Sequence, residues 1–185
     1  MRISKPAPAH SNAGFTLFEM LIVVVIAGIL ALIAAPGWLS FANNRRAEAG
    51  RDQVLQVIRQ AQTRALQTRR TQVVDFVTTS VPPQLRIAGV AQPLGAQLPS
   101  AQQGRTSFGL AVVGSANTGC STGSTACLVF DERGNVVIAD GEPPSEEEGI
   151  MKIVVTSPAS SGAKRCVIVK TILGAMQNGS GDECN

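Results

Sequence analysis

The stretch that decides the fold is GFTLFEMLIVVVIAGILALIAAP, which runs from Gly14 to Pro36. Between Phe15 and Ala35 the only charged residue is Glu19, and these 21 residues would form a helix about 31 Å long at 1.5 Å of rise per residue. That length crosses the hydrocarbon core of a bilayer, so the sequence predicts a transmembrane helix over residues 15–35. Pro36 lacks a backbone donor and crowds the preceding turn, and it therefore predicts a kink in the helix.

The first fourteen residues contain the basic residues Arg2 and Lys5 and no acidic residue. Basic residues ahead of an apolar run indicate that this end stays in the cytoplasm and that the rest of the chain is exported. Two simple interpretations of this N-terminal segment are a plain signal anchor and a cleaved secretory signal peptide that ends at Ala34-Ala35. A signal peptide fits less well, because its apolar region would be unusually long and would contain an acidic residue.

Glu19 distinguishes these interpretations, because a carboxylate inside an apolar span costs a few kcal/mol and needs a compensating partner. A lone glutamate reaching toward the membrane surface is one explanation. A cut after Gly14 provides another, since it would give Phe15 a free amine four residues before Glu19. The amine of one copy could then neutralise the carboxylate of the next, and such head-to-tail contacts generate open helical filaments.

The sequence Gly14-Phe15-Thr16-Leu17-Phe18-Glu19, followed by an apolar run, resembles the prepilin signature of type IV pilins and type II secretion pseudopilins. Phe18 departs from it mildly, because isoleucine or valine is more usual there. The resemblance implies that a prepilin peptidase removes residues 1–14 as a leader and that Phe15 is N-methylated. It also implies a single-pass protein of the bacterial inner membrane with its C-terminal head in the periplasm. Membrane lipid would surround the stem until an inner-membrane assembly platform adds the subunit to a helical filament of pilins or pseudopilins.

After Pro36 the apolar residues return at helical spacing, which predicts that an amphipathic helix completes a stem over residues 15–71. Its expected buried positions are Ala47, Val54, Ile58, Ala61 and Ala65, with Leu55 and Leu66 widening the stripe. The opposite face is rich in arginine and glutamine. Residues 37–71 have a net charge of +5 and residues 72–185 of −3. This basic stem is either a solvated helix face or a surface for anionic lipid headgroups or acidic neighbours.

Residues 72–185 change to short β-branched runs separated by Gly, Pro and Ser, which predicts a β-rich head. The expected fold is α+β, with the long N-terminal helix packed against an antiparallel sheet or β-sandwich. The predicted strands are Val73–Thr78, Leu85–Val90, Thr106–Val113, Ala126–Phe130, Val136–Ala139, Met151–Thr156 and Arg165–Leu173. Residues 81–105 are expected to form a long loop, and the same is expected of residues 115–125. The clearest hairpin is LVFDERGNVVI, residues 128–138, in which Asp131 and Gly134 suit the turn.

Two segments narrow the resemblance within the pilin-like proteins. The stem segment RQAQTRALQTRRTQVV and the head segment LVFDERGNV are similar to H-type pseudopilins and FimT-like minor pilins. In those relatives the head is a two-sheet β structure that rests on the stem. This match is looser than the one at the N-terminus.

The chain has four cysteines, all on the exported side: Cys120, Cys127, Cys166 and Cys184. An even number in an oxidising compartment predicts disulfides. Of the three possible pairings, the local one (Cys120 with Cys127, Cys166 with Cys184) is favoured. A four-cysteine zinc site is disfavoured, because neither pair has the spacing of a metal-binding knuckle.

Enzymatic chemistry has little support in the sequence. The only histidine is His10, so triads and imidazole metal sites are not expected in the head, and no glycine-rich phosphate loop follows a strand. No cofactor or metal is therefore expected. The acidic run Glu146-Glu147-Glu148 is better explained as a solvated loop than as a calcium site.

The expected function is that of a non-catalytic minor pseudopilin or pilin, and two alternatives stay open. One is a FimT-like minor pilin that binds DNA for uptake. Those relatives carry a C-terminal Gly-Arg-x-Arg element, whereas the corresponding Gly174-Ala175-Met176-Gln177 keeps the glycine and has neither arginine, so nucleic acid is not expected as a partner. The other is a membrane-anchored β domain unrelated to filaments.

Overall fold

The computed structural model describes residues 15–98, 107–114, 120–138, 149–158 and 162–185, and only the backbone of residues 34–36. The chain forms two compact units, Met1–Leu39 and Ser40–Asn185. Helix α1 (Leu17–Thr68) belongs to both, because the division falls inside it. The predicted stem boundaries of 15 and 71 thus lie two to three residues outside the helix. The leader, residues 1–14, lies outside the described residues.

In the first unit, the large apolar side chains of α1 are exposed all around the helix, from Leu17 at 85% to Leu39 at 60%. No single helix of the described residues is both long and apolar enough to count as a membrane span. The segments Leu17–Ile33 and Gly37–Thr68, taken together across the break between them, do pass that test of length and composition. Pro36 lies in this break, and the kink assigned to it stays a prediction.

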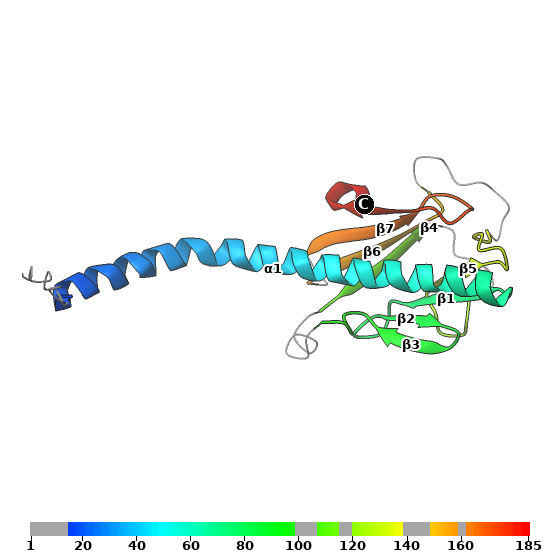
Figure 1. The fold of residues 1–185 in the computed structure, drawn as a ribbon, viewed down its shortest axis with the longest axis horizontal. Helices are drawn as coiled ribbons and strands as arrows, with labels where there is room; N and C mark the ends of the chain where they lie inside the picture. Colours follow the sequence, from blue (N-terminus) through cyan, green and yellow to red (C-terminus); the bar gives the residue numbers. More distant parts are fainter. Residues whose placement is uncertain (1–14, 99–106, 115–119, 139–148, 159–161) are drawn as a thin grey trace, which may run out of the picture. The chain divides into compact units, whose positions relative to one another are not determined.

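The second unit contains two four-stranded antiparallel sheets that pack with the C-terminal half of α1 (Figure 1). The first sheet has the order β3-β2-β1-β5, with the strands β1 (Gln72–Val77), β2 (Gln84–Ile87), β3 (Val90–Pro93) and β5 (Ala126–Phe130). The second has the order β4-β6-β7-β8, with the strands β4 (Gly109–Gly114), β6 (Met151–Ser157), β7 (Ala163–Val169) and β8 (Met176–Ser180). A short 3-10 helix, η1 (Gly181–Cys184), follows β8. The expected α+β fold of a long N-terminal helix and antiparallel sheets is confirmed.

The core of the second unit is built from a buried helical stripe and the inner faces of both sheets. The five predicted stripe positions, Ala47, Val54, Ile58, Ala61 and Ala65, are all fully buried. Val57 is buried beside them, whereas Leu66 is 51% exposed and Leu55 only partly buried, so the stripe is rotated slightly from the expected one. Sheet residues such as Phe76 and Val155 close the cluster. Every residue of this core belongs to the second unit.

Two glutamines of α1 attach loops of the head to the helix. The buried Gln53 donates from Nε2 to the Pro93 carbonyl at 2.9 Å and accepts from the Gly95 N–H at 2.7 Å. Gln62 donates to the carbonyls of Gly134 and Leu173. The predicted arginine- and glutamine-rich outer face is therefore not wholly solvated, because a side-chain amide can satisfy main-chain groups that a loop leaves unpaired.

Strand prediction succeeded for Ala126–Phe130, which is β5, and failed where a turn interrupts a β-branched run. The predicted strand Leu85–Val90 is divided by Ala88 and Gly89, which both have positive φ and form a two-residue hairpin turn between β2 and β3. The expected loop over residues 81–105 thus contains two strands. The final predicted strand, Arg165–Leu173, ends at Val169.

Two more strand predictions differ from the structure. In the 128–138 hairpin the return arm forms only an isolated bridge between Phe130 and Val136, and Ala139 lies outside the described residues. Strand β8 was not predicted. The other predicted strands begin or end within three residues of the observed ones, and Thr106 lies outside the described residues.

Candidate functional site

The start of α1 carries the residues that the sequence singles out. Gly14 lies outside the described residues, and Phe15 is 75% exposed just before the helix. The Glu19 main-chain N–H donates to Thr16 Oγ1 at 3.2 Å, so Thr16 caps the helix that begins at Leu17. Thr16 has no predicted role from the sequence, although a threonine followed three residues later by a glutamate is a known signal of a helix start.

The Glu19 carboxylate lies in the first turn of α1, where the helix dipole favours a negative charge. Its residue is exposed, and among the described residues no cationic group forms an ion pair with it. The neighbouring side chains on the helix are apolar and exposed, among them Phe18 at 71% and Met20 at 53%. The carboxylate is therefore presented on an apolar surface where a cation from another molecule can reach it.

The cysteines form the disulfides Cys120–Cys127 and Cys166–Cys184, which is the local pairing favoured by the sequence. A buried carboxylate holds the first disulfide loop in place. Asp75 on β1 accepts from the Ser121 main-chain N–H at 3.0 Å and from the Ser121 hydroxyl at 2.5 Å. Sequence reasoning missed Asp75, because nothing in the sequence places Ser121 beside it.

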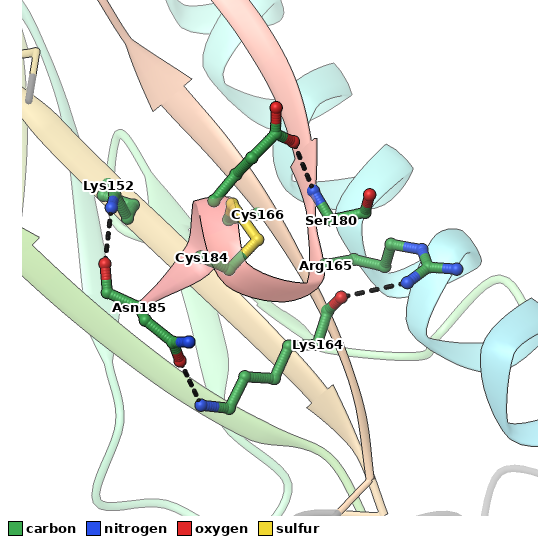
Figure 2. The surroundings of a disulfide bond; sticks show 8 residues. Lys152, Lys164, Arg165, Cys166, Ser180, Cys184 and Asn185 are labelled. Carbon is green, nitrogen blue, oxygen red and sulfur yellow. Dashed lines mark hydrogen bonds between the residues drawn. A yellow bond between two sulfur atoms is a disulfide. The ribbon is translucent and has the colours of Figure 1, made fainter. Parts of the chain in front are cut away.

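The second disulfide fixes the last residues of the chain against the second sheet, as Figure 2 shows. Lys152 Nζ donates to the main-chain oxygen of Asn185 at 2.7 Å, and Lys164 Nζ donates to the side-chain oxygen of the same residue at 2.5 Å. Cys166 and Cys184 are buried with Val154 and Ile168 in a small apolar cluster of their own. Three of these side chains belong to β6 and β7, and the disulfide packs Cys184 of η1 against them.

Two of the basic groups near the C-terminal turn, Lys164 and Arg165, have acceptors within the head. Arg165, next to Lys164 on β7, pairs with Glu48 of α1 at 3.4 Å. Gly174 has a positive φ of 77° and packs against Gln62, so its place in the structure is a turn contacting the helix. The acidic residues 146–148 lie outside the described residues. Within the described part of the chain, no group of three or more His, Cys, Asp or Glu residues is placed to hold a metal ion.

This chain is similar to known proteins in three comparisons. Residues 9–35 match the family described as the prokaryotic N-terminal methylation motif. A stretch of 50 residues is 50% identical to the type IV major pilin protein PilA of Myxococcus xanthus (strain DK1622), covering 26% of this chain and 22% of that protein's length. The solved structure of the type IV minor pilin FimU of Pseudomonas aeruginosa (strain PAO1) aligns with a TM-score of 0.48 at 14% identity, over 78% of this chain and 99% of that one.

The matched segment contains Gly14, Phe15 and Glu19 together with the apolar run. The chain is type IV pilin-like, and it carries the N-terminal methylation motif of those proteins.

Proposed function

We propose that the protein is a structural, non-catalytic subunit of a helical filament of the type IV pilus or type II secretion class. In this proposal a prepilin peptidase cuts between Gly14 and Phe15 and the new N-terminus is methylated. The observation that carries the proposal is the Gly14–Glu19 motif, which lies within the matched residues 9–35 at the start of a helix with exposed apolar side chains.

The exposed apolar surface of the first unit needs cover from outside the chain, and we propose that lipid and then neighbouring stems provide it. Side chains from Leu17 to Ile33 are between 42% and 85% exposed where they are large and apolar, so the first unit leaves them without internal cover. Lipid covers them while the protein is a single-pass protein of the inner membrane with its head in the periplasm. In the filament other stems replace the lipid at low net cost, because lipid tails and packed apolar side chains are similar surroundings.

Glu19 then determines how one subunit meets the next. Its carboxylate is costly in an apolar environment unless a cation compensates it. The Phe15 amine created by cleavage supplies one positive charge per subunit, and a neighbour displaced along the filament axis brings that amine to Glu19. This pairing is head to tail and does not close on itself, which is the geometry of an open filament. The assembly platform and the neighbouring pilins are the partners this requires.

Within the pilin-like proteins we place the chain near the H-type pseudopilins and FimT-like minor pilins. Support for this narrower placement comes from the segment 128–136. There β5 leads into a turn in which Asp131 accepts main-chain N–H groups of Arg133 and Asn135, before the chain returns to pair with Phe130.

The proposal is tested by the mass of the mature protein and by filament incorporation of a Glu19 variant. We expect protein purified from cells with the peptidase to begin at Phe15 and to carry one added methyl group. We expect Glu19→Gln to be cleaved normally and to stay in the membrane fraction, but to be lost from sheared filaments. Glu48→Gln is the matched control, because it removes a carboxylate from the same helix outside the motif.

A mature protein that keeps residues 1–14, or one that begins near residue 35, would contradict the processing step. Normal incorporation of Glu19→Gln would contradict the charge-pairing step even if cleavage at Gly14 is found.

A further inference from the structure

The first turns of the second unit carry a cation stacked on an aromatic ring. The Arg45 guanidinium carbon lies 5.2 Å from the centroid of the Phe41 ring. Both groups face solvent, since Phe41 is 52% exposed and the Arg45 side chain 68%. Helical side chains point back toward the helix N-terminus, and the guanidinium therefore lies about one turn before its own Cα, over the Phe41 ring.

The distance along the chain places this pair near a membrane surface. At 1.5 Å per residue, Phe41 lies at most about 9 Å of helix beyond Ala35, where the apolar run ends. The polar headgroup layer extends roughly 5–8 Å beyond the hydrocarbon core on each side of a bilayer. Since the Arg45 guanidinium is held over the Phe41 ring, it reaches the level of the lipid phosphates even though its Cα lies farther out.

The charges around Arg45 leave an excess of positive charge. Glu48 is shared by two arginines: its Oε2 accepts from Arg45 at 3.3 Å and its Oε1 from Arg165 at 3.4 Å. Arg46 donates to the Asn43 side chain, which is neutral. An exposed ion pair of this kind contributes little stability, and a guanidinium has five donors, so Arg45 can bind a second anion without losing Glu48.

We propose that Phe41 and Arg45 form a binding site for the phosphodiester of an anionic phospholipid in the leaflet next to the head. The proposal rests on the proposed function in one respect, namely that residues 15–35 lie in a membrane before assembly. The ring occupies the interfacial layer, where aromatic side chains are enriched at both membrane surfaces. The guanidinium binds the phosphate through charge-assisted hydrogen bonds. The pair fixes the depth of the stem in the bilayer, and the contact is broken when the subunit is extracted into a filament.

A lipid fits this site better than an acidic protein surface does. The pair follows directly after the apolar run, at a height where a bilayer supplies both an apolar layer for the ring and a phosphate for the guanidinium. Trp38, the only tryptophan of the chain, precedes Phe41 by three residues and is 74% exposed. Tryptophan is enriched at the same interfacial depth, and here it also provides a single fluorescent reporter.

The test uses the full chain reconstituted in phosphatidylcholine vesicles containing a small fraction of dansyl-labelled lipid. Energy transfer from Trp38 to dansyl-phosphatidylglycerol is compared with transfer to dansyl-phosphatidylcholine. We expect the anionic lipid to be enriched up to about fivefold near Trp38, the factor that one cation near an anionic surface supplies. Arg45→Gln should remove most of this preference, and Phe41→Leu should weaken it.

Arg59→Gln is the matched control, because it removes an exposed arginine from the same helix about 21 Å farther from the apolar run. It should keep the preference. Inorganic phosphate added at constant ionic strength should not reduce the preference, because the site binds the phosphodiester of a lipid at the bilayer surface.

An equal preference in the wild type and in Arg45→Gln overturns the inference, and so does an equal loss in Arg59→Gln. Quenching of Trp38 by brominated lipids distinguishes failure of the lipid-site proposal from failure of the proposed function, because it tests only whether the stem lies in a membrane. If these lipids quench Trp38 but no anionic preference is found, the lipid site is wrong and the membrane-anchored stem stands. If only aqueous iodide quenches Trp38, both the lipid site and the proposed membrane stage fall.

Discussion

Gly50 packs directly against side chains of the second sheet and its approach, Val155 and Phe108, and the structure predicts the effect of adding one methyl group there. A Cβ at this position would lie 2.9 Å from Val155 Cγ1 and 3.1 Å from Phe108 Cε1. Contacts this short require a neighbour to move. Val155 is fully buried in β6, and its branched side chain has little freedom to rotate. We therefore expect Gly50→Ala to be destabilising, although alanine is the better helix former.

The magnitude follows from two opposing terms. Replacing glycine by alanine inside a helix contributes about 1 kcal/mol of stability. Overpacking a well-filled core costs about 1–3 kcal/mol, so the net loss should be about 1 kcal/mol. Val155→Ala alone should cost about 2–3 kcal/mol through lost burial and the cavity that it leaves. In the double variant the methyl group added by Gly50→Ala enters that cavity, and the combined loss should be smaller than the sum by about 1–2 kcal/mol.

The measurement is equilibrium urea unfolding of residues 40–185, followed by far-ultraviolet circular dichroism. This unit should fold alone, because it supplies every residue of its own core. Val154→Ala is the control, since Val154 belongs to the separate cluster with Cys166 and Cys184 and should be additive with Gly50→Ala. A stabilised Gly50→Ala, or additivity with Val155→Ala, would show that the close approach of helix and sheet does not govern stability at this position.

Three further predictions concern single side chains of the head. Gln53→Leu preserves bulk but leaves two main-chain groups unpaired, and it should lower the free energy of unfolding by about 1–3 kcal/mol. Cys184→Ser opens the disulfide that joins residues 18 positions apart, and it should cost about 3 kcal/mol in the same assay. The main-chain N–H of Asn135 is the largest of the causes that lower the pKa of Asp131. The ionised carboxylate therefore stabilises the turn above its usual pKa, and this support is lost as the pH falls through the lowered pKa. Hydrogen exchange at the Asn135 amide, corrected for its intrinsic rate, should lose protection on acidification in the wild type and not in Asp131→Asn.

The parts of the fold that the sequence predicts well are those determined by local patterns. The buried stripe of α1 repeats at helical spacing, and Ala126–Phe130 is an unbroken apolar strand that is buried throughout. The turn at Asp131 and Gly134 has its own local chemistry, since an aspartate oxygen accepts main-chain N–H groups and a glycine takes a positive φ of 77°.

The parts of the fold that the sequence does not predict depend on contacts with residues far away along the chain. Strand β8, Met176–Ser180, reads MQNGS and lacks β-branched residues, and it is a strand because it pairs with β7. Strand β3 is a largely exposed edge strand that contains Pro93. Gln53 resembles a solvated residue in the sequence, and it points inward because the loop at Gly95 passes beside it. Propensity cannot reveal such contacts, since tertiary context decides edge strands and buried amides.

The two parts of α1 are covered in different ways. The apolar side chains of the first unit need cover from outside the chain, whereas those of the second unit are buried in the core of the head. The exposed large apolar side chains of the first unit extend to Leu39, and the buried stripe of the second unit begins at Ala47, so the two sets do not overlap along the chain. Changes of stability at distant sites without shared partners are nearly additive. Under the proposed function, exchanging lipid for neighbouring stems around the first unit would thus leave the core of the head unchanged. In the proposed filament, a head that folds before assembly would therefore enter without refolding.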